Sequence, residues 1–182
     1  MDEAELESLV AAARSHDAGA VAGLCEEFYP KVYRFMLNRG ARREDAEDLA
    51  SEVCVRVMRS LPRQKGFFPA WVFRIAANLL TDTYRRVARG REVELTDKLA
   101  DTVPDPRQEE RSLLPHQLDQ ALAKLTPEQR EVIHLRFVEG YDAGEIARIQ
   151  GRPAGAVRAL QFRALETLRE ELAGKAGGSH GA

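Results

Sequence analysis

The sequence has little of what builds disulfide-rich, metal-binding or membrane-spanning proteins. Its two cysteines, Cys25 and Cys54, form no C-x-x-C pair and stand beside no histidine, so we expect buried thiols in a reducing compartment. No apolar run approaches the roughly 20 residues that a membrane helix needs. The start, Met1 to Glu7, is acidic, the wrong sign for a signal peptide. These absences predict a cytoplasmic protein.

Aromatic residues are also scarce, at 7% of the 182 residues, whereas apolar residues reach 44%. The abundance of alanine, leucine, glutamate and arginine favours helices, and the length allows one large or two small domains. We therefore predict an all-α fold. The net charge of −2 says little about partners, but the charges are segregated along the chain.

One stretch, from Arg56 to Arg91, is strongly basic: it carries nine arginine or lysine residues and a single acid, Asp82. Four aromatic residues lie inside it: Phe67, Phe68, Trp71 and Phe73. Cations beside flat rings suit unpaired nucleic acid, because the cations attract phosphates and the rings stack on bases. The alternative is a solvated amphipathic helix whose rings are core residues, and charge patterning alone does not separate the two.

The first helical block runs from about Asp17 to Arg89 and contains a loop at Pro62 to Phe68. Before the loop, apolar spacing predicts a helix whose inward face holds Ala46, Leu49, Val53 and Val57. After it, steps of roughly 100° per residue give a helix with two faces. The core face holds Val72, Ile75, Ala76, Leu79 and Thr83. The other face aligns Trp71, Arg74, Asn78, Asp82 and Arg85, and we expect the nucleic-acid contact there.

Helical periodicity vanishes between Arg89 and Arg111, where Pro104 and Pro106 break any helix and most charges are acidic. This pattern predicts a flexible acidic linker. A loop between packed helices is the alternative, but more than about 20 structureless residues are unusual within one compact domain.

In the second block, Leu113 to Leu172, capping residues predict where the helices begin and end. Thr126 to Gln129 is a capping box with proline at the first helical position, and Asp142 with Glu145 repeats the box before a short helix that closes at Gly151. A short helix, a glycine turn and a longer helix that Pro153 can open form the outline of a helix-turn-helix.

The final helix has an apolar ring on its outer side. With Val157 as the reference, helical geometry places Leu160, Ala164, Leu165 and Leu168 toward the core. The outward side holds Arg158, Ala159, Phe162 and Arg163. In a major groove the ring can meet a thymine methyl or a sugar, and the arginines guanine or phosphate. Alternatively, Phe162 packs against a neighbouring domain.

Two segments resemble the extracytoplasmic-function (ECF) sigma factors of bacterial RNA polymerase. Residues 45–53 (DAEDLASEV) and 71–78 (WVFRIAAN), with Asp82, Arg85 and Arg86, resemble their second region. Residues 125–133 (LTPEQREVI) and 145–147 (EIA), with Gly151, 155–158 (GAVR) and 163–164 (RA), resemble their fourth region. The resemblance implies a region 2 domain at 1–89, a linker at 90–112, a region 4 helix-turn-helix domain at 113–172 and a disordered tail at 173–182.

The resemblance implies a transcription initiation factor that joins core RNA polymerase, recognises promoter DNA, opens it and is then released. Polymerase contacts are expected at the β′ clamp coiled coil and the β flap. The residues that match the clamp-binding helix face are Asp48, Ser51, Glu52, Cys54 and Met58. Ordinary surface or core positions remain their alternative, above all for Cys54 and Met58. Such factors are commonly held inactive by an anti-sigma protein, and we expect one here.

The same resemblance assigns the DNA contacts. Asn78 matches the position that receives a flipped base of the minus-ten element, and the loop from Pro62 to Phe68 matches the loop that forms the base pocket. Trp71 suits a stacking platform and a core tryptophan equally well. In the first block the predicted DNA-binding residues are Lys65, Phe67, Phe68, Trp71, Arg74, Asn78, Arg85 and Arg86. For the minus-thirty-five element they are Arg152, Arg158, Ala159, Phe162 and Arg163.

Departures from the family pattern limit this transfer. The family usually has an apolar residue at Gln150, a hydroxyl at Pro153 and Ala156, and a polar group at Leu160. The missing hydroxyls are groups that bind phosphate, so the promoter sequence cannot be copied from better-known members.

Three other functions fit the sequence less well. Glu131 and His134 have the spacing of a di-iron ligand pair, but no second copy exists and there is no phosphate loop or nucleophile elbow. We therefore expect no enzyme, no cofactor and no small-molecule substrate. A repressor would explain the second block but not the first. A signalling adaptor would bind through apolar faces alone, and its binding would respond little to salt, unlike DNA binding.

Overall fold

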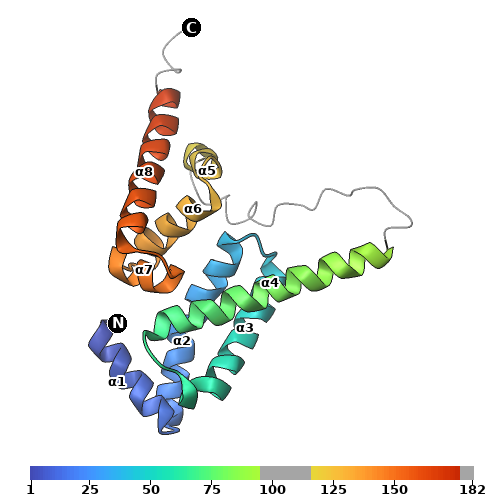
Figure 1. Cartoon of the computed structure of the whole chain (residues 1–182), viewed down its shortest axis with the longest axis vertical. Coiled ribbons are helices and arrows are strands. Elements are labelled where there is room, and N and C mark those ends of the chain that lie inside the picture. Colours follow the sequence, from blue (N-terminus) through green and yellow to red (C-terminus); the bar gives the residue numbers. More distant parts are fainter. Residues whose placement is uncertain (95–115, 177–182) are drawn as a thin grey trace. The chain divides into compact units, whose positions relative to one another are not determined.

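The computed structural model describes residues 1–94 and 116–176, and within these ranges it contains helices and no strand (Figure 1). The all-α prediction is confirmed. The chain divides into two compact units, Met1–Asp105 and Pro106–Ala182. Most of the predicted linker and the end of the predicted tail, residues 95–112 and 177–182, lie outside the described residues.

The described part of the first unit, residues 1–94, contains four α-helices and one short 3-10 turn. Their bounds are α1 Glu3–Arg14, α2 Ala18–Asn38, α3 Arg43–Ser60, η1 Leu61–Arg63 and α4 Phe68–Glu94. Helix α2 packs against each of the other three α-helices. The sequence analysis does not predict α1, and α4 continues past the predicted boundary at residue 89.

Large side chains fill the core of the first unit. Val32, Phe35 and Met36 of α2 are at most 1% exposed, and the Phe35 ring lies 5.0 Å from that of Phe73 on α4. The Phe28 ring meets Phe68 edge-on at 5.0 Å. These two aromatic contacts join α2 to α4.

Capping residues fix the helix starts in the first unit. Asp2 forms a capping box with Glu5 at the start of α1, and the Asp17 carboxylate accepts the amide of Ala20 at 2.7 Å at the start of α2. After α2 the backbone turns at Gly40 with φ of +91°, a conformation that favours glycine.

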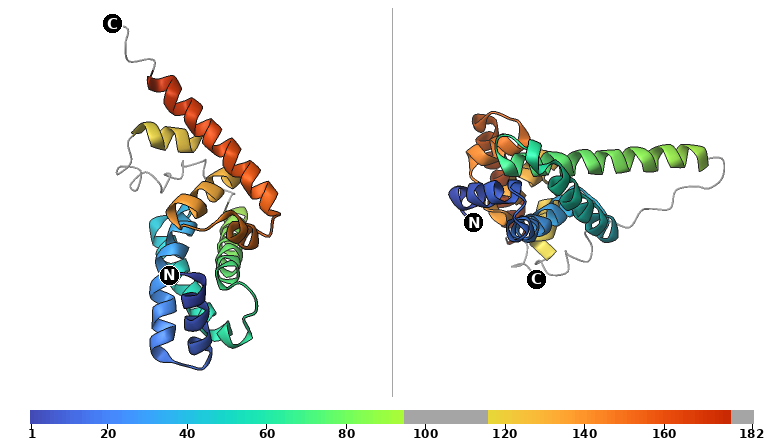
Figure 2. Two further views of the ribbon diagram at one scale, coloured as in Figure 1. Left: turned by 90° about the vertical axis from the view of Figure 1, so that its left-hand side faces the viewer. Right: turned by 90° about the horizontal axis from the view of Figure 1, so that it is seen from below.

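The described part of the second unit combines three short α-helices and a π turn with one long α-helix. They are α5 His116–Ala123, α6 Pro127–Ile133, a π turn η4 His134–Val138, α7 Ala143–Gln150 and the long α8 Ala154–Ala176. Helix α8 is one continuous helix in the left view of Figure 2, and α5, α6 and α7 all pack against it. Six of its described core residues are fully buried: Ala121, Val132, Leu135, Ile146, Val157 and Ala164.

The structure confirms the predicted helix starts and stops in the second unit. Thr126 and Gln129 form the predicted capping box, and so do Asp142 and Glu145. Helix α7 ends at Gly151, whose φ of +64° is left-handed. One prediction is wrong: Leu165, which was placed toward the core, is 42% exposed, because at about 80° from Val157 it lies at the edge of the inward face, whereas Ala164 beside it is fully buried.

Candidate nucleic-acid and polymerase-binding surfaces

Helix α4 presents the predicted polar row on its outer side. Arg74, Asn78 and Arg85 are exposed, whereas Val72, Ala76 and Leu79 on the core face are buried. Arg85 lies 4.0 Å from Asp82 in a solvent-exposed ion pair, which leaves most of its charge available to an incoming phosphate. Arg86, next to this row, is also exposed and donates to the Thr83 hydroxyl at 3.3 Å.

The loop before α4 contains both exposed and buried residues. Lys65 is exposed and Phe67 is half-buried. Phe68 is only 5% exposed, because its ring packs on Phe28 and lies 5.8 Å from the ring of Trp71. This burial corrects the expectation that the Phe68 ring is free to stack on a base, since it is packed against Phe28 and Trp71.

Trp71 occupies an intermediate position between core and surface. Its ring rests on Phe68 on one side, and the residue as a whole is half-buried. The structure therefore supports both of the roles left open by the sequence: Trp71 anchors the start of α4 and still has exposed ring surface.

The predicted polymerase-binding residues lie along α3. Asp48 and Ser51 are exposed, Glu52 binds Arg56 at 2.8 Å, and Met58 is 42% exposed although its side chain is apolar. Spacings of three and four residues place Asp48, Ser51 and Glu52 on one side of the helix. An exposed methionine beside charged groups is typical of a protein-binding surface.

Cys54 lies partly inward. Burial, together with the neighbouring Cys25 thiol of α2, raises the pKa of Cys54 to about 12. Both thiols are half-buried and free. At neutral pH Cys54 is therefore a neutral thiol that contributes packing between α2 and α3 as well as a small part of the surface.

On α8 the predicted recognition residues are all exposed. Phe162 is 63% exposed, the most of any large apolar side chain described, and Arg158, Ala159 and Arg163 surround it. Arg152, in the turn before α8, is exposed as well, whereas Leu160 is half-buried. The outward direction of Phe162 is as the helical wheel predicts, and its contact with DNA stays a prediction.

Comparison with known proteins accounts for both surfaces. A family model described as Sigma-70 region 2 matches residues 24–90, and one described as Sigma-70, region 4 matches residues 121–170. The chain belongs to the sigma-70 family. Members of this family are transcription initiation factors. The region 2 match contains the exposed sides of α3 and α4, and the region 4 match contains the exposed residues of α8 described above.

Similar proteins place this sigma factor in the ECF group. It is 34% identical over 178 residues to the ECF RNA polymerase sigma factor BldN of Streptomyces coelicolor, covering 94% of this chain and 67% of the relative. It is 38% identical over 176 residues to the ECF RNA polymerase sigma factor ShbA of Streptomyces griseus, covering 89% and 92%. A solved structure of CnrH in complex with the cytosolic domain of CnrY has a TM-score of 0.64 and 25% identity, and covers 91% of this chain and 96% of that one.

Buried polar contacts in the sigma factor's second unit were not anticipated from the sequence. Gln150, where the family usually has an apolar residue, donates from its amide to the Glu131 carboxylate at 3.2 Å. His134 lies 3.1 Å from the carboxylate of Glu139, whose side chain is 1% exposed. Glu131 and His134 thus have separate partners, and within the described ranges no group of three His, Cys, Asp or Glu residues could hold a metal ion.

None of the helices in the described part of the chain is both long and apolar enough to span a membrane.

Proposed function

We propose that this sigma factor joins core RNA polymerase through α3, holds the unpaired minus-ten strand against α4 and its loop, and reads the minus-thirty-five element with α8. Residues 1–89 then form the polymerase and minus-ten domain, and residues 113–172 the upstream domain. The observation that carries the proposal is the exposed row of Arg74, Asn78 and Arg85, which lies beside the exposed Lys65 loop on a helix whose other face is core.

The minus-ten contact combines charge, rings and one amide. A flipped base costs a few kcal/mol of unstacking, which stacking and polar contacts must return. Asn78 offers an exposed amide that can both donate and accept, and Phe67 and Trp71 offer partly exposed rings. Arg74, Arg85 and Arg86 attract the phosphates that flank such a base.

The polymerase contact uses the outer side of α3. Asp48, Glu52 and Met58 provide two carboxylates and a flexible apolar side chain on a rigid helix, a combination suited to a coiled coil with basic residues. Ser51 lies between them, and Cys54 contributes the part of its side chain that is not covered by Cys25. We propose the β′ clamp for this surface and the β flap for the second unit.

The upstream contact uses the second unit's final helix. Phe162 suits a thymine methyl, Arg158 and Arg163 suit guanine or phosphate, and Arg152 suits a phosphate near the start of the helix. Ala159 allows close approach of the helix to the groove.

We also propose control by an anti-sigma protein. In the solved complex that resembles this chain, CnrH is bound by the cytosolic domain of CnrY. Here large exposed apolar side chains lie in both units: Met58, Tyr84, Val87, Phe137, Val138, Phe162 and Leu165. A partner that covers such residues would block polymerase and DNA together. We place this activity in the cytoplasm and propose that the chain catalyses no reaction of its own.

In vitro transcription tests the proposal. The purified chain is mixed with core polymerase and a randomised promoter library, and start sites are mapped. Enrichment of two spaced elements upstream of defined start sites is the expected result. A chain that binds duplex promoter DNA tightly without polymerase would instead favour a repressor, and failure to direct initiation would refute the proposal.

A further inference from the structure

The loop that leads into α4 is held by a contact from α1, a helix outside the residue sets described above. Gln64 is 4% exposed, so its side-chain amide is buried. A buried amide needs hydrogen-bond partners, because losing them costs more than an exposed bond contributes. All of its partners lie in α1 or in the loop itself.

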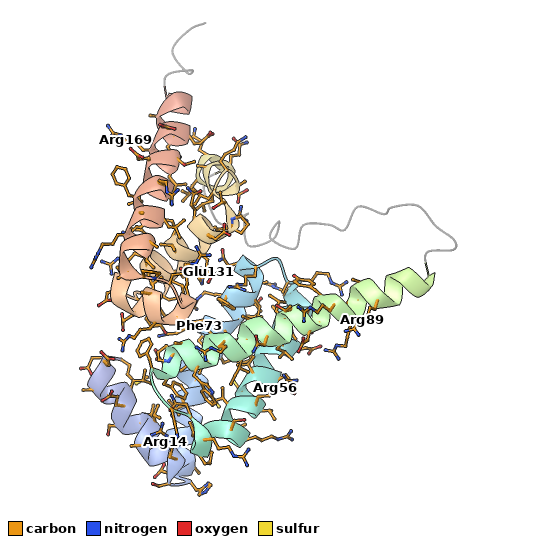
Figure 3. All side chains as sticks on the ribbon, viewed as in Figure 1. Arg14, Arg56, Phe73, Arg89, Glu131 and Arg169 are labelled. Carbon is orange, nitrogen blue, oxygen red and sulfur yellow. The ribbon has the colours of Figure 1, made fainter. Side chains whose placement is uncertain are left out.

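The hydrogen bonds of Gln64 form a closed set. Arg14, at the end of α1 (Figure 3), donates from one guanidinium nitrogen to the Gln64 backbone carbonyl at 2.7 Å and also to the Gln64 side-chain oxygen. The Gln64 amide nitrogen donates to the Gly66 carbonyl at 2.7 Å. The Gln64 backbone N–H donates to Leu61 at 3.0 Å.

These bonds fix the backbone around Lys65 and Phe67, the two loop residues proposed to contact the minus-ten strand. Lys65 lies between the two bonded residues, and Gly66 has a φ of +75° that allows the tight turn. Phe67 follows directly, and its carbonyl accepts the backbone N–H of Trp71 at 3.2 Å in the first turn of α4. The conformation that directs Lys65 and Phe67 outward is therefore set from inside by Gln64 and Arg14.

We propose that Arg14 is a positioning residue for minus-ten recognition, acting through Gln64 on the loop that carries Lys65 and Phe67. The inference rests on the proposed function of that loop. Arg14 touches no DNA in this account. Its charged donor gives stronger bonds than a neutral one, and it spans a separation of 50 residues in the chain. Helix α1 thereby contributes to promoter selectivity although it carries no predicted contact.

The test uses the full chain in complex with core polymerase. The probe is a pool of single-stranded oligonucleotides randomised over six positions, and bound molecules are sequenced. Arg14→Ala and Gln64→Leu are compared with Arg42→Ala, which removes an exposed arginine paired with Asp45 in the same unit. Affinity for core polymerase is measured in parallel for every variant.

We expect Arg14→Ala to weaken binding of the wild-type-selected oligonucleotide by about tenfold and to flatten base preference, because a loop freed of its charged hydrogen bonds samples other conformations. Gln64→Leu should do the same, and the double variant should be little worse than either single one. Arg14→Lys, which keeps the charge, should recover part of the loss. Arg42→Ala should leave preference unchanged.

A double-mutant cycle between Arg14 and Lys65 tests whether Arg14 acts on binding through the loop. Lys65→Ala should weaken binding in the wild type but much less in the Arg14→Ala background, because the lysine is no longer held in place. Equal losses in both backgrounds would show that Arg14 does not act through the loop. Unchanged base preference in Arg14→Ala and Gln64→Leu, or a matching loss of polymerase affinity, would overturn the inference.

Failure of the proposed function looks different. In that case the wild-type complex itself selects no sequence from the pool, whatever residue stands at position 14. A selective wild type with equally selective variants refutes only the role of Arg14.

Discussion

The two units of this sigma factor reach stable helical structures by different means. In the described part of the first unit, long helices bury large rings, with Phe35 and Phe73 at most 2% exposed. In the second, α6 and α7 have seven and eight residues, and the fully buried side chains are aliphatic. The short helices depend on capping boxes and a left-handed glycine at their ends.

This difference indicates how each unit presents its surface. In the first unit, packing of the core face holds α4 in place. The polar groups on the outer side of α4 are therefore not needed to stabilise the fold. In the second, the angle between α7 and α8 follows from the turn at Gly151, and recognition depends on the geometry of a few backbone residues.

Truncating a core ring should have the largest effect. Phe35→Ala should lower the free energy of unfolding of the first unit by about 3 to 5 kcal/mol, because it opens a cavity where the ring met Phe73. Urea unfolding followed by circular dichroism measures it. Phe162→Ala is the matched control, since that ring is 63% exposed, and it should change stability by less than about 0.5 kcal/mol. Similar losses for both would contradict the description of the two cores.

Removing one recognition arginine should come next. Arg163→Ala should weaken binding of the polymerase complex to its selected minus-thirty-five element by about 1 to 3 kcal/mol if the guanidinium reads a base. Arg169→Ala, an exposed arginine further along α8 (Figure 3), serves as the control and should have little effect. Titrations against mutated elements decide the role: a uniform loss across all sequences would make Arg163 a phosphate contact.

Deleting a cap should have a smaller effect, confined to the second unit. Asp142→Ala should cost about 0.5 to 2 kcal/mol of stability, whereas Asp142→Asn should retain most of it, because asparagine also caps. Thermal unfolding at neutral pH measures both.

The pH dependence of this cap has a defined sign. The backbone N–H of Glu145, followed by that of Gly144, lowers the pKa of Asp142 from its usual 3.8. A lowered folded-state pKa stabilises the protein above the unfolded value, and the benefit is lost as pH falls through the folded one. The gap between wild type and Asp142→Ala should therefore narrow below about pH 4. A constant gap down to pH 2 would argue against a charged cap.

The smallest expected effect concerns Cys54. Because burial and Cys25 raise its pKa to about 12, its thiol should react slowly with iodoacetamide at pH 8 in the folded protein and rapidly in urea. The raised folded-state pKa also means that stability falls as pH rises from about 9 toward 12. Mass spectrometry of the labelled peptide follows the reaction, with Cys25→Ala as the comparison. Rapid labelling of the folded wild type at pH 8 would contradict this environment.

The sequence predicts most of what depends on local signals. Capping boxes at Thr126 and Asp142, the stop at Gly151 and the outward Phe162 all follow from residues within one or two helical turns of each other. These features need no knowledge of tertiary contacts.

Features that depend on contacts between distant residues cannot be predicted from local sequence patterns. A phenylalanine in a basic stretch suits both core and DNA, and only the contact with Phe28 assigns Phe68 to the core. Leu165 lies at the edge of the apolar face of its helix, and whether a neighbouring helix covers that edge depends on tertiary packing. Arg14 and Gln64 are 50 residues apart, and no periodicity links them.

Permanganate footprinting of Asn78→Ala in complex with core polymerase tests the central claim that the outer side of α4 holds the unpaired minus-ten strand. The probe is a promoter selected by the wild-type complex, and thymine reactivity reports strand opening while a parallel titration reports polymerase affinity. The account predicts strongly reduced reactivity with unchanged affinity. Wild-type reactivity in the variant would contradict it.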